Sequence, residues 1–282
     1  MRASFGIRGQ TLRTLLSILF LVSGLAVVGR AEAASTASNF VEDMTWTELD
    51  DRLAAGATTV LVPIGGVEQS GPHMALGKHN VRAHVLASRI AQKLGNAVVA
   101  PVVAYVPEGS IEPPAGHMKF TGTLSIPDAT FEALLEATAR SFCQHGFKDV
   151  FFLGDHGGYQ QNEERAAARL NKAWAARPAC RAHALLDYYR VTQTEFVKAL
   201  EAKGFGADEI GLHAGLADTA LSLAIDPALV RTELLARAAK AGPREGVHGD
   251  PRRATAELGQ IGIDRVIEAS VAQIKAQVAR AR

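Results

Sequence analysis

The sequence predicts an α/β fold with a mainly parallel sheet, on two observations. Four short apolar runs alternate with segments of helical periodicity, at residues 60–64, 97–106, 150–153 and 182–189. Two of these runs lead directly into glycine-rich segments with polar side chains, at residues 65–80 and 154–158. Strands that end in such loops before a helix are typical of open parallel sheets, in which ligands bind at the carboxyl edge.

The helices are predicted from apolar residues that recur on one face. In the clearest case, Val81, Leu86, Ile90 and Leu94 share a face and Gly95 ends the helix. The predicted helices span residues 43–55, 81–94, 128–145, 161–176, 194–203, 216–225 and 254–282. Residues 107–125 are rich in proline and glycine and predict a long ordered loop, which in a compact domain is usually functional.

The amino terminus has the pattern of a secretory signal. Arg2, Arg8 and Arg13 precede an apolar run at residues 15–28, and small residues follow, so cleavage is expected after Ala33. The alternative is a membrane anchor, but a spanning helix needs roughly 20 apolar residues. We therefore expect residues 1–33 to be a signal peptide, residues 34–282 to form one domain, and the protein to be periplasmic or secreted without a stable membrane anchor.

Composition excludes some partners. The chain has 30 Lys and Arg against 29 Asp and Glu, and removal of the first 33 residues leaves a net charge of about −2. This balance gives no basic surface for nucleic acid. The two cysteines, Cys143 and Cys180, could pair in an oxidising compartment or remain buried thiols, and the sequence leaves both alternatives open.

Polar residues that are distant in sequence are expected to meet. Glu68, His79 and His156 follow predicted strands, and His213 lies in a third glycine-containing segment at residues 211–215. Because the carboxyl ends of parallel strands lie at one edge, these four side chains could converge there. One carboxylate with several imidazoles suggests a metal site. The alternative is that these side chains are solvated in exposed loops.

Five segments follow one another along the chain: residues 62–77 (VPIGGVEQSGPHMALG), 116–125 (GHMKFTGTLS), 154–158 (GDHGG), 213–219 (HAGLADT) and 246–255 (GVHGDPRRAT). In this order they resemble the motifs of the creatininase family of metal-dependent amidohydrolases. The resemblance implies a single three-layer α/β/α domain, a divalent metal ion, usually zinc, at the carboxyl edge of the sheet, and hydrolysis of a C–N bond. It also implies a homo-oligomer, often a hexamer.

The resemblance places Glu68 and His156 on metal-ligand positions of the family. Ser70 stands where the family has a His, and His79 stands where it has an Asp that bridges two ions. We therefore expect one ion, favouring Zn²⁺, held by Glu68, His79 and His156 with a water molecule. The competing hypothesis is a degenerate site that binds a small molecule without converting it.

The same comparison assigns roles to further residues. Asp218 is expected to act as general base or as another ligand, and His213 to stabilise the developing oxyanion or to protonate the leaving nitrogen. Asp155 is expected to hydrogen-bond a ligating His or to join the metal site itself. The residues expected near the substrate are Ser70, His73, His117, Asp155 and Tyr159.

The sequence thus predicts an exported zinc amidohydrolase acting on a small cyclic amide, lactam, formamide or short peptide. Creatinine is disfavoured, because the family members that hydrolyse it have a Tyr-Glu pair where this chain has Gly157 and Gly158. The alternative is an exported small-molecule binding protein with the same fold.

Overall fold

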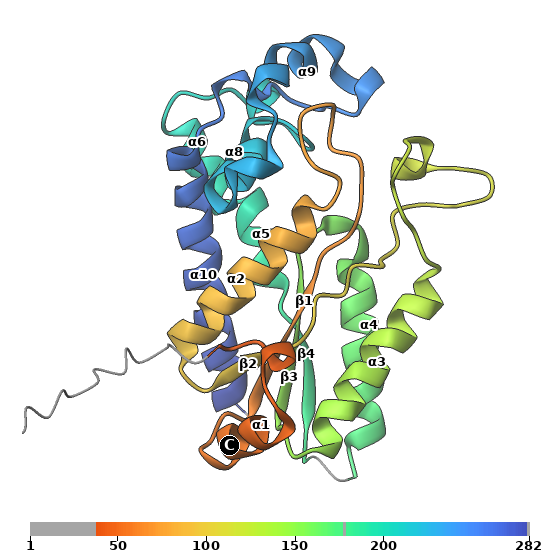
Figure 1. The fold of residues 1–282 in the computed structure, drawn as a ribbon, viewed down its shortest axis with the longest axis vertical. Helices are drawn as coiled ribbons and strands as arrows, with labels where there is room; N and C mark the ends of the chain where they lie inside the picture. Colours follow the sequence, from red (N-terminus) through yellow and green to blue (C-terminus); the bar gives the residue numbers. More distant parts are fainter. Residues whose placement is uncertain (1–37, 177–178, 281–282) are drawn as a thin grey trace, which may run out of the picture. The chain divides into compact units, whose positions relative to one another are not determined.

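A parallel sheet with strand order β2-β1-β3-β4 lies at the centre of the computed structural model, which describes residues 38–176 and 179–280 (Figure 1). The strands are β1 (Thr59–Ile64), β2 (Ala97–Val99), β3 (Asp149–Gly154) and β4 (Arg181–Ala184). Val60 is paired with Val98 on one side and Val150 on the other. The predicted α/β class and parallel sheet are confirmed.

The two central strands are buried along their whole length, which explains their continuous apolar sequences. Side chains alternate between the two faces. Leu61 and Phe151 pack into one core, whereas Val60 and Phe152 pack into the other. Each face therefore requires its own layer of helices.

Helices cover both faces, so the domain has the three layers implied by the family resemblance (Figure 1). The first core contains residues of α2 (Lys78–Leu94), α5 (Leu186–Gln193), α6 (Glu195–Glu201), α8 (Leu216–Ile225), α9 (Leu235–Ala241) and α10 (Ala256–Ala279). The second contains residues of α3 (Asp128–Gln144) and α4 (Gln160–Trp174), and partly buried leucines of α1 (Trp46–Ala54) pack against it. A short helix, α7 (Ala207–Ile210), precedes α8.

Several boundaries differ from the prediction. Helix α2 begins at Lys78, three residues before the predicted start at Val81, so His79 belongs to a helix instead of a loop. Strand β2 ends at Val99 because Pro101 follows closely and has no N–H for the ladder. The predicted strand at residues 182–189 ends at Ala184, and its second half forms α5.

The third polar loop also has a different origin. Residues 211–215 follow helix α7 and not a strand, which corrects the expectation that three strand ends supply the site. Backbone hydrogen bonds to His248 hold this loop in place. His248 N–H donates to His213 O at 2.8 Å, and Leu212 N–H donates to His248 O at 2.8 Å. His213 is thereby brought to the site from the helical layer.

Cys143 and Cys180 form a disulfide, with a Cα–Cα distance of 5.7 Å. The bridge joins the last turn of α3 to the residue before β4, at the amino edge of the sheet. Within the described ranges, no helix has the length and apolar character needed to cross a membrane. The predicted signal peptide, residues 1–33, lies outside the described residues.

Candidate metal centre and pocket

Loops and helix starts at the carboxyl edge of the sheet supply the site. Glu68 follows β1, and His156 follows β3. Both are held deep in the domain, since Glu68 is fully buried and the His156 side chain is 18% exposed. These two residues were predicted to share a site, and the structure brings Glu68 Oε2 to 3.5 Å from His156 Nε2.

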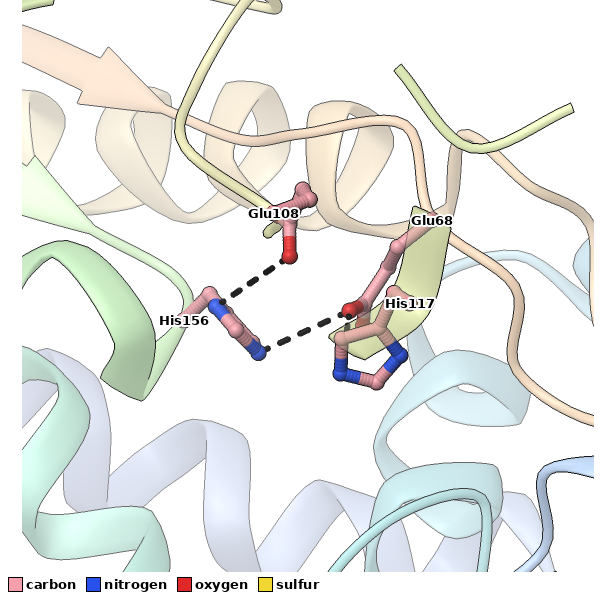
Figure 2. Close-up of side chains that lie close together, drawn as sticks. All are labelled: Glu68, Glu108, His117 and His156. Atoms are coloured by element: carbon pink, nitrogen blue, oxygen red, sulfur yellow. Dashed lines mark ion pairs between the residues drawn. The ribbon is translucent and has the colours of Figure 1, made fainter. Parts of the chain in front are cut away.

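The long loop between β2 and α3 adds two residues to this edge (Figure 2). Glu108 is 4% exposed, and its Oε2 lies 3.7 Å from His156 Nδ1. His117, in a short 3-10 helix (Gly116–Lys119), places Nε2 at 3.4 Å from Glu68 Oε2. Gly66 provides the space for Glu108, because a Cβ at Gly66 would lie 2.8 Å from Glu108 Oε1.

Glu68, Glu108, His117 and His156 form a group suited to a cation. Each offers one ligand atom, and the four atoms lie within 4.8 Å of one another. Glu68 Oε2 and both carboxylate oxygens of Glu108 are buried and have no hydrogen-bond partner among the described residues. Buried carboxylate oxygens are costly when unpaired. Two carboxylates and two imidazoles are a ligand set that divalent metal ions use, so these residues fit a metal ion.

Burial sets the charge of this group in the absence of an ion. Burial lowers the pKa of His156 to about 3 and also lowers the pKa of His117. Both rings are therefore neutral near pH 7, which is the form that ligates metals. Burial, together with the neighbouring Glu68 carboxylate, raises the pKa of Glu108 to about 9. Glu108 therefore holds a proton until a cation replaces it.

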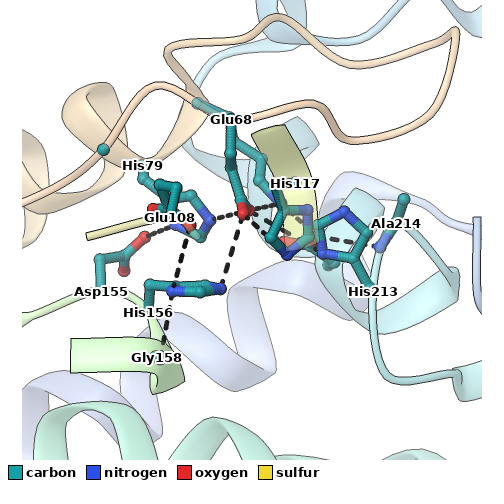
Figure 3. A network of polar contacts seen from close by, with 12 residues as sticks. Glu68, His79, Glu108, His117, Asp155, His156, Gly158, His213 and Ala214 are labelled. Atoms are coloured by element: carbon teal, nitrogen blue, oxygen red, sulfur yellow. Dashed lines mark hydrogen bonds and ion pairs between the residues drawn. The ribbon is translucent and has the colours of Figure 1, made fainter. Parts of the chain in front are cut away.

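The other oxygen of Glu68 faces a different set of partners (Figure 3). Oε1 lies 2.6 Å from His79 Nε2 and 3.6 Å from Lys78 Nζ. His79 Nδ1 lies 2.6 Å from Asp155 Oδ2, so both ring nitrogens of His79 contact carboxylates. Burial opposes ionisation of Glu68, but His79 and Lys78 outweigh it and hold the pKa of Glu68 well below its usual range.

Two further ion pairs complete this side. Arg82 Nη1 donates to Asp218 Oδ1 at 2.6 Å, and Arg82 Nε donates to Asp155 Oδ2 at 2.9 Å. Lys78 Nζ contacts Asp218 Oδ2, which also accepts from Ala214 N–H at 3.1 Å. Burial alone would raise the pKa of Asp218, but Lys78 and Arg82 hold it well below its usual range. Asp218 is therefore ionised near pH 7, and both of its oxygens are bonded.

A pocket opens beside these groups. Its walls include Glu68, Lys78, Arg82, His156, His213 and Asp218. Glu68 and His156 thus belong both to the four-residue group and to the pocket wall, so an ion held by the group would adjoin the pocket. His213 Nε2 lies 2.9 Å from Gln69 O and 3.1 Å from Gln69 Nε2. We assign the proton to Nε2, because the shorter contact is to a carbonyl oxygen, which only accepts; Nδ1 is then the acceptor nitrogen. Burial lowers the pKa of His213 to about 4, so the ring is neutral.

The remaining predicted site residues are buried. Tyr159 is fully buried, and its hydroxyl donates to Gly65 O at 2.6 Å. His73 Nε2 lies 2.9 Å from Thr219 Oγ1, and Ser70 is fully buried. Within the described chain, these three residues and Asp155 are not part of the pocket wall. Their predicted contact with substrate stays a prediction.

The family follows from a comparison with known proteins. A family model described as creatininase, creatinine amidohydrolase, matches residues 42–274. The chain belongs to the creatininase family. It is a hydrolase that acts on C–N amide bonds, and the prediction made from the five sequence segments is confirmed.

Curated relatives within the family act on different substrates. A mycofactocin precursor peptide peptidase of Mycolicibacterium smegmatis is 31% identical over 240 residues, which cover 76% of this chain and 83% of the relative. A creatinine amidohydrolase of Pseudomonas putida is 28% identical over 197 residues, which cover 68% of this chain and 74% of the relative. The family is thus compatible with a small cyclic amide and with a peptide.

Solved creatininase structures share the fold. A crystal structure of creatinine amidohydrolase (creatininase) superposes with a TM-score of 0.72 at 23% identity, covering 86% of this chain and 98% of the other. Other creatininase structures are described as a Zn-Zn type and as an Mn form.

Sequence reasoning did not identify Glu108 and placed His117 near the substrate. Glu108 is one of two acidic residues in the loop at residues 107–125, and irregular loops carry no periodicity that shows which side chain points inward. Its burial beside His156 depends on how the loop folds back over the sheet edge. The accompanying sign in sequence is Gly66, which makes room for Glu108.

Proposed function

We propose that this protein hydrolyses the C–N bond of a small amide with one divalent metal ion, most consistent with zinc, bound beside the pocket. The observation that carries the proposal is the set of unpartnered buried oxygens on Glu68 and Glu108 next to the neutral rings of His117 and His156. Imidazole and carboxylate ligands suit zinc better than magnesium, which prefers oxygen alone.

Two ligand sets can be distinguished. The sequence favours Glu68, His79 and His156, whereas the geometry favours Glu68, Glu108, His117 and His156. Both nitrogens of His79 already contact carboxylates, so we assign His79 to holding Glu68 and Asp155 in place. Replacing His117 with Asn should then weaken zinc binding more than replacing His79 with Asn. The reverse order would favour the set predicted from sequence.

A bound zinc ion activates water for attack and polarises the carbonyl group of an amide. The chain supplies proton transfer and orientation. His213 lines the pocket, its ring is neutral, and its Nδ1 lies 3.9 Å from Glu68 Oε1. It is placed to take a proton during attack and to return it to the leaving nitrogen. Asp218, with both oxygens bonded, orients Lys78 and the start of α8, and is a weak candidate for general base.

Export is part of the proposal. The predicted signal at residues 1–33 and the disulfide between Cys143 and Cys180 both support an oxidising compartment, because disulfides persist in the periplasm and outside the cell and are rare in the cytosol. We therefore propose a periplasmic or secreted enzyme acting on a small amide or short peptide. Assembly as a homo-oligomer, with a hexamer as the form implied by resemblance, stays a prediction.

The test is metal analysis of the purified protein, followed by assays against cyclic amides, formamides and short peptides with and without a chelator. Bound zinc and hydrolysis that the chelator abolishes would support the proposal. The matched pair is Glu68→Gln, expected to be inactive, and Glu195→Gln on the surface, expected to keep full activity. Metal-free protein that binds amides without hydrolysing them would instead support the small-molecule binding protein.

A further inference from the structure

Lys78 is a buried cation that the proposed reaction does not use. Its side chain is 0% exposed, although lysine is almost never fully buried unless it is paired. Lys78 Nζ contacts Asp218 Oδ2 and lies 3.6 Å from Glu68 Oε1. Lys78 is the first residue of α2, one position before His79, so the backbone of the helix fixes where the ammonium lies.

The Lys78 ammonium lies on the Oε1 side of the Glu68 carboxylate, and the two oxygens of Glu68 have different surroundings. On the side of Oε2, that oxygen and both oxygens of Glu108 lack hydrogen-bond partners among the described residues. On the side of Oε1, the carboxylates are paired with protein cations and donors. Oε1 contacts His79 and Lys78, and Asp218 contacts Lys78 and Arg82. The third carboxylate on this side, Asp155, is satisfied by Arg82, His79 and the Tyr188 hydroxyl.

On the Oε1 side each carboxylate already has a protein partner. Glu68 contacts Lys78 and His79, Asp155 contacts Arg82 and His79, and Asp218 contacts Lys78 and Arg82. A divalent ion between Glu68 and Asp218 would have to displace the ammonium that now lies between them. A second ion beside an ammonium held in place would also be repelled strongly, because the site is buried.

We propose that Lys78 is a built-in cation that occupies the position between Glu68 and Asp218 and restricts the centre to one metal ion per chain. This inference rests on the proposed metal centre. Asp218 positions the ammonium through Oδ2. Arg82 Nη1 in turn holds Asp218 through the other carboxylate oxygen, Oδ1, at 2.6 Å. The neighbouring carboxylate Glu68 is thus shared between one fixed protein cation on Oε1 and one exchangeable metal ion on Oε2.

The experiment counts zinc ions. Metal-free full-length protein is titrated with zinc, and bound zinc per chain is measured by elemental analysis after gel filtration. We expect one ion for the wild type, and a second, weaker ion when Lys78→Ala opens the space between Glu68 and Asp218. Lys172→Ala, an exposed lysine on α4, is the matched control and should keep one ion. Lys78→Gln, which is neutral and closer in size to lysine, should also bind a second ion with detectable affinity.

Each result decides the inference. Two ions in the wild type, or one ion in both Lys78 variants with their circular dichroism unchanged, would overturn it. If the Lys78 variants fail to fold, the wild-type count still decides, because two ions contradict a site closed by Lys78 and one ion supports it. Two ions in the wild type would leave the proposed amide hydrolysis intact, whereas a wild type that binds no zinc would overturn the metal centre as well.

Discussion

Two clusters of charged residues differ in how completely their atoms are paired. Between α3 and α4, the oxygens of Glu132 accept hydrogen bonds from Asn162, Arg165 and Arg169 at 2.6 to 2.9 Å. At the carboxyl edge of the sheet, Glu68 Oε2 and both oxygens of Glu108 have no such partner among the described residues. Both clusters contain buried carboxylates, but only the Glu132 cluster satisfies them within the described chain.

The contrast separates a structural network from a binding site. Burial raises the pKa of Glu132, but hydrogen bonds from Arg169 and Arg165 outweigh it, so the pKa falls below its usual value. Burial beside Glu68 instead raises the pKa of Glu108 to about 9. A folded chain accepts unpaired buried carboxylates where they serve a function. Four predictions test this contrast between the two clusters.

The largest effect is expected on catalysis. Glu68→Gln should reduce amide hydrolysis below detection, because it removes a charged ligand atom and leaves His117 and His156 without their central partner. Glu132→Gln should keep hydrolysis within a factor of about two, as expected for a variant outside the site. Initial rates on the best amide substrate measure both. Equal losses of activity in the two variants would contradict a functional difference between the two clusters.

The next effect is a dependence of stability on pH in the metal-free protein. The pKa of Glu108 is raised from 4.5 to about 9, so burial of this carboxyl costs no stability through its ionisation below pH 4.5, and the free energy of unfolding falls as pH rises towards 9. The slope approaches 1.4 kcal/mol per pH unit at most. Urea unfolding of the wild type and Glu108→Gln between pH 5 and about 9 measures it. Parallel curves for the two proteins would contradict the raised pKa of Glu108.

Zinc should stabilise the protein by binding to the group of Glu68, Glu108, His117 and His156, and should not bind to the Glu132 cluster. At a free concentration about 100 times the dissociation constant, binding adds about 2.7 kcal/mol, which raises the melting temperature by roughly 5–11 °C for a domain of this size. The shift should disappear in Glu108→Gln or His117→Asn and persist in Glu132→Gln. Differential scanning fluorimetry with and without zinc is sufficient. A zinc shift of equal size in all four proteins would place the ion elsewhere.

The smallest effect is expected at Glu132. Glu132→Gln should lower the free energy of unfolding by about 1 kcal/mol, because its partners Arg165 and Arg169 are 45% and 46% exposed and solvent screens the lost charge. Chemical denaturation of metal-free protein at pH 7 measures this. In the same conditions Glu108→Gln should gain stability. A gain in Glu132→Gln would mean that pairing does not distinguish the clusters.

Sequence reasoning reached the fold because it depends on local patterns. The apolar run of β1 and the periodic apolar face of α2 can each be recognised in a short stretch of sequence. The five family segments predicted that Glu68 and His156 share a site. Helix α2 begins earlier than its apolar face suggested, because the residues that open it, Lys78 and His79, are polar and face the site instead of the core.

The rest of the site depends on contacts that no local pattern encodes. Glu108 meets His156 across 48 positions, and the irregular loop that carries Glu108 gives no period from which its direction follows. Lys78 likewise meets Asp218 across 140 positions, and lysine at a helix start is ordinarily solvated. Both residues are recognisable only when burial and pairing are known together.

The disulfide joining Cys143 to Cys180 has a practical implication. It lies at the end of the strands opposite the pocket, so we expect loss of the disulfide to lower heat resistance more than turnover. Protein made in a reducing host can therefore display normal kinetics while ageing quickly on storage. A batch judged by its initial rate alone would conceal that difference, whereas half-life at elevated temperature would reveal it.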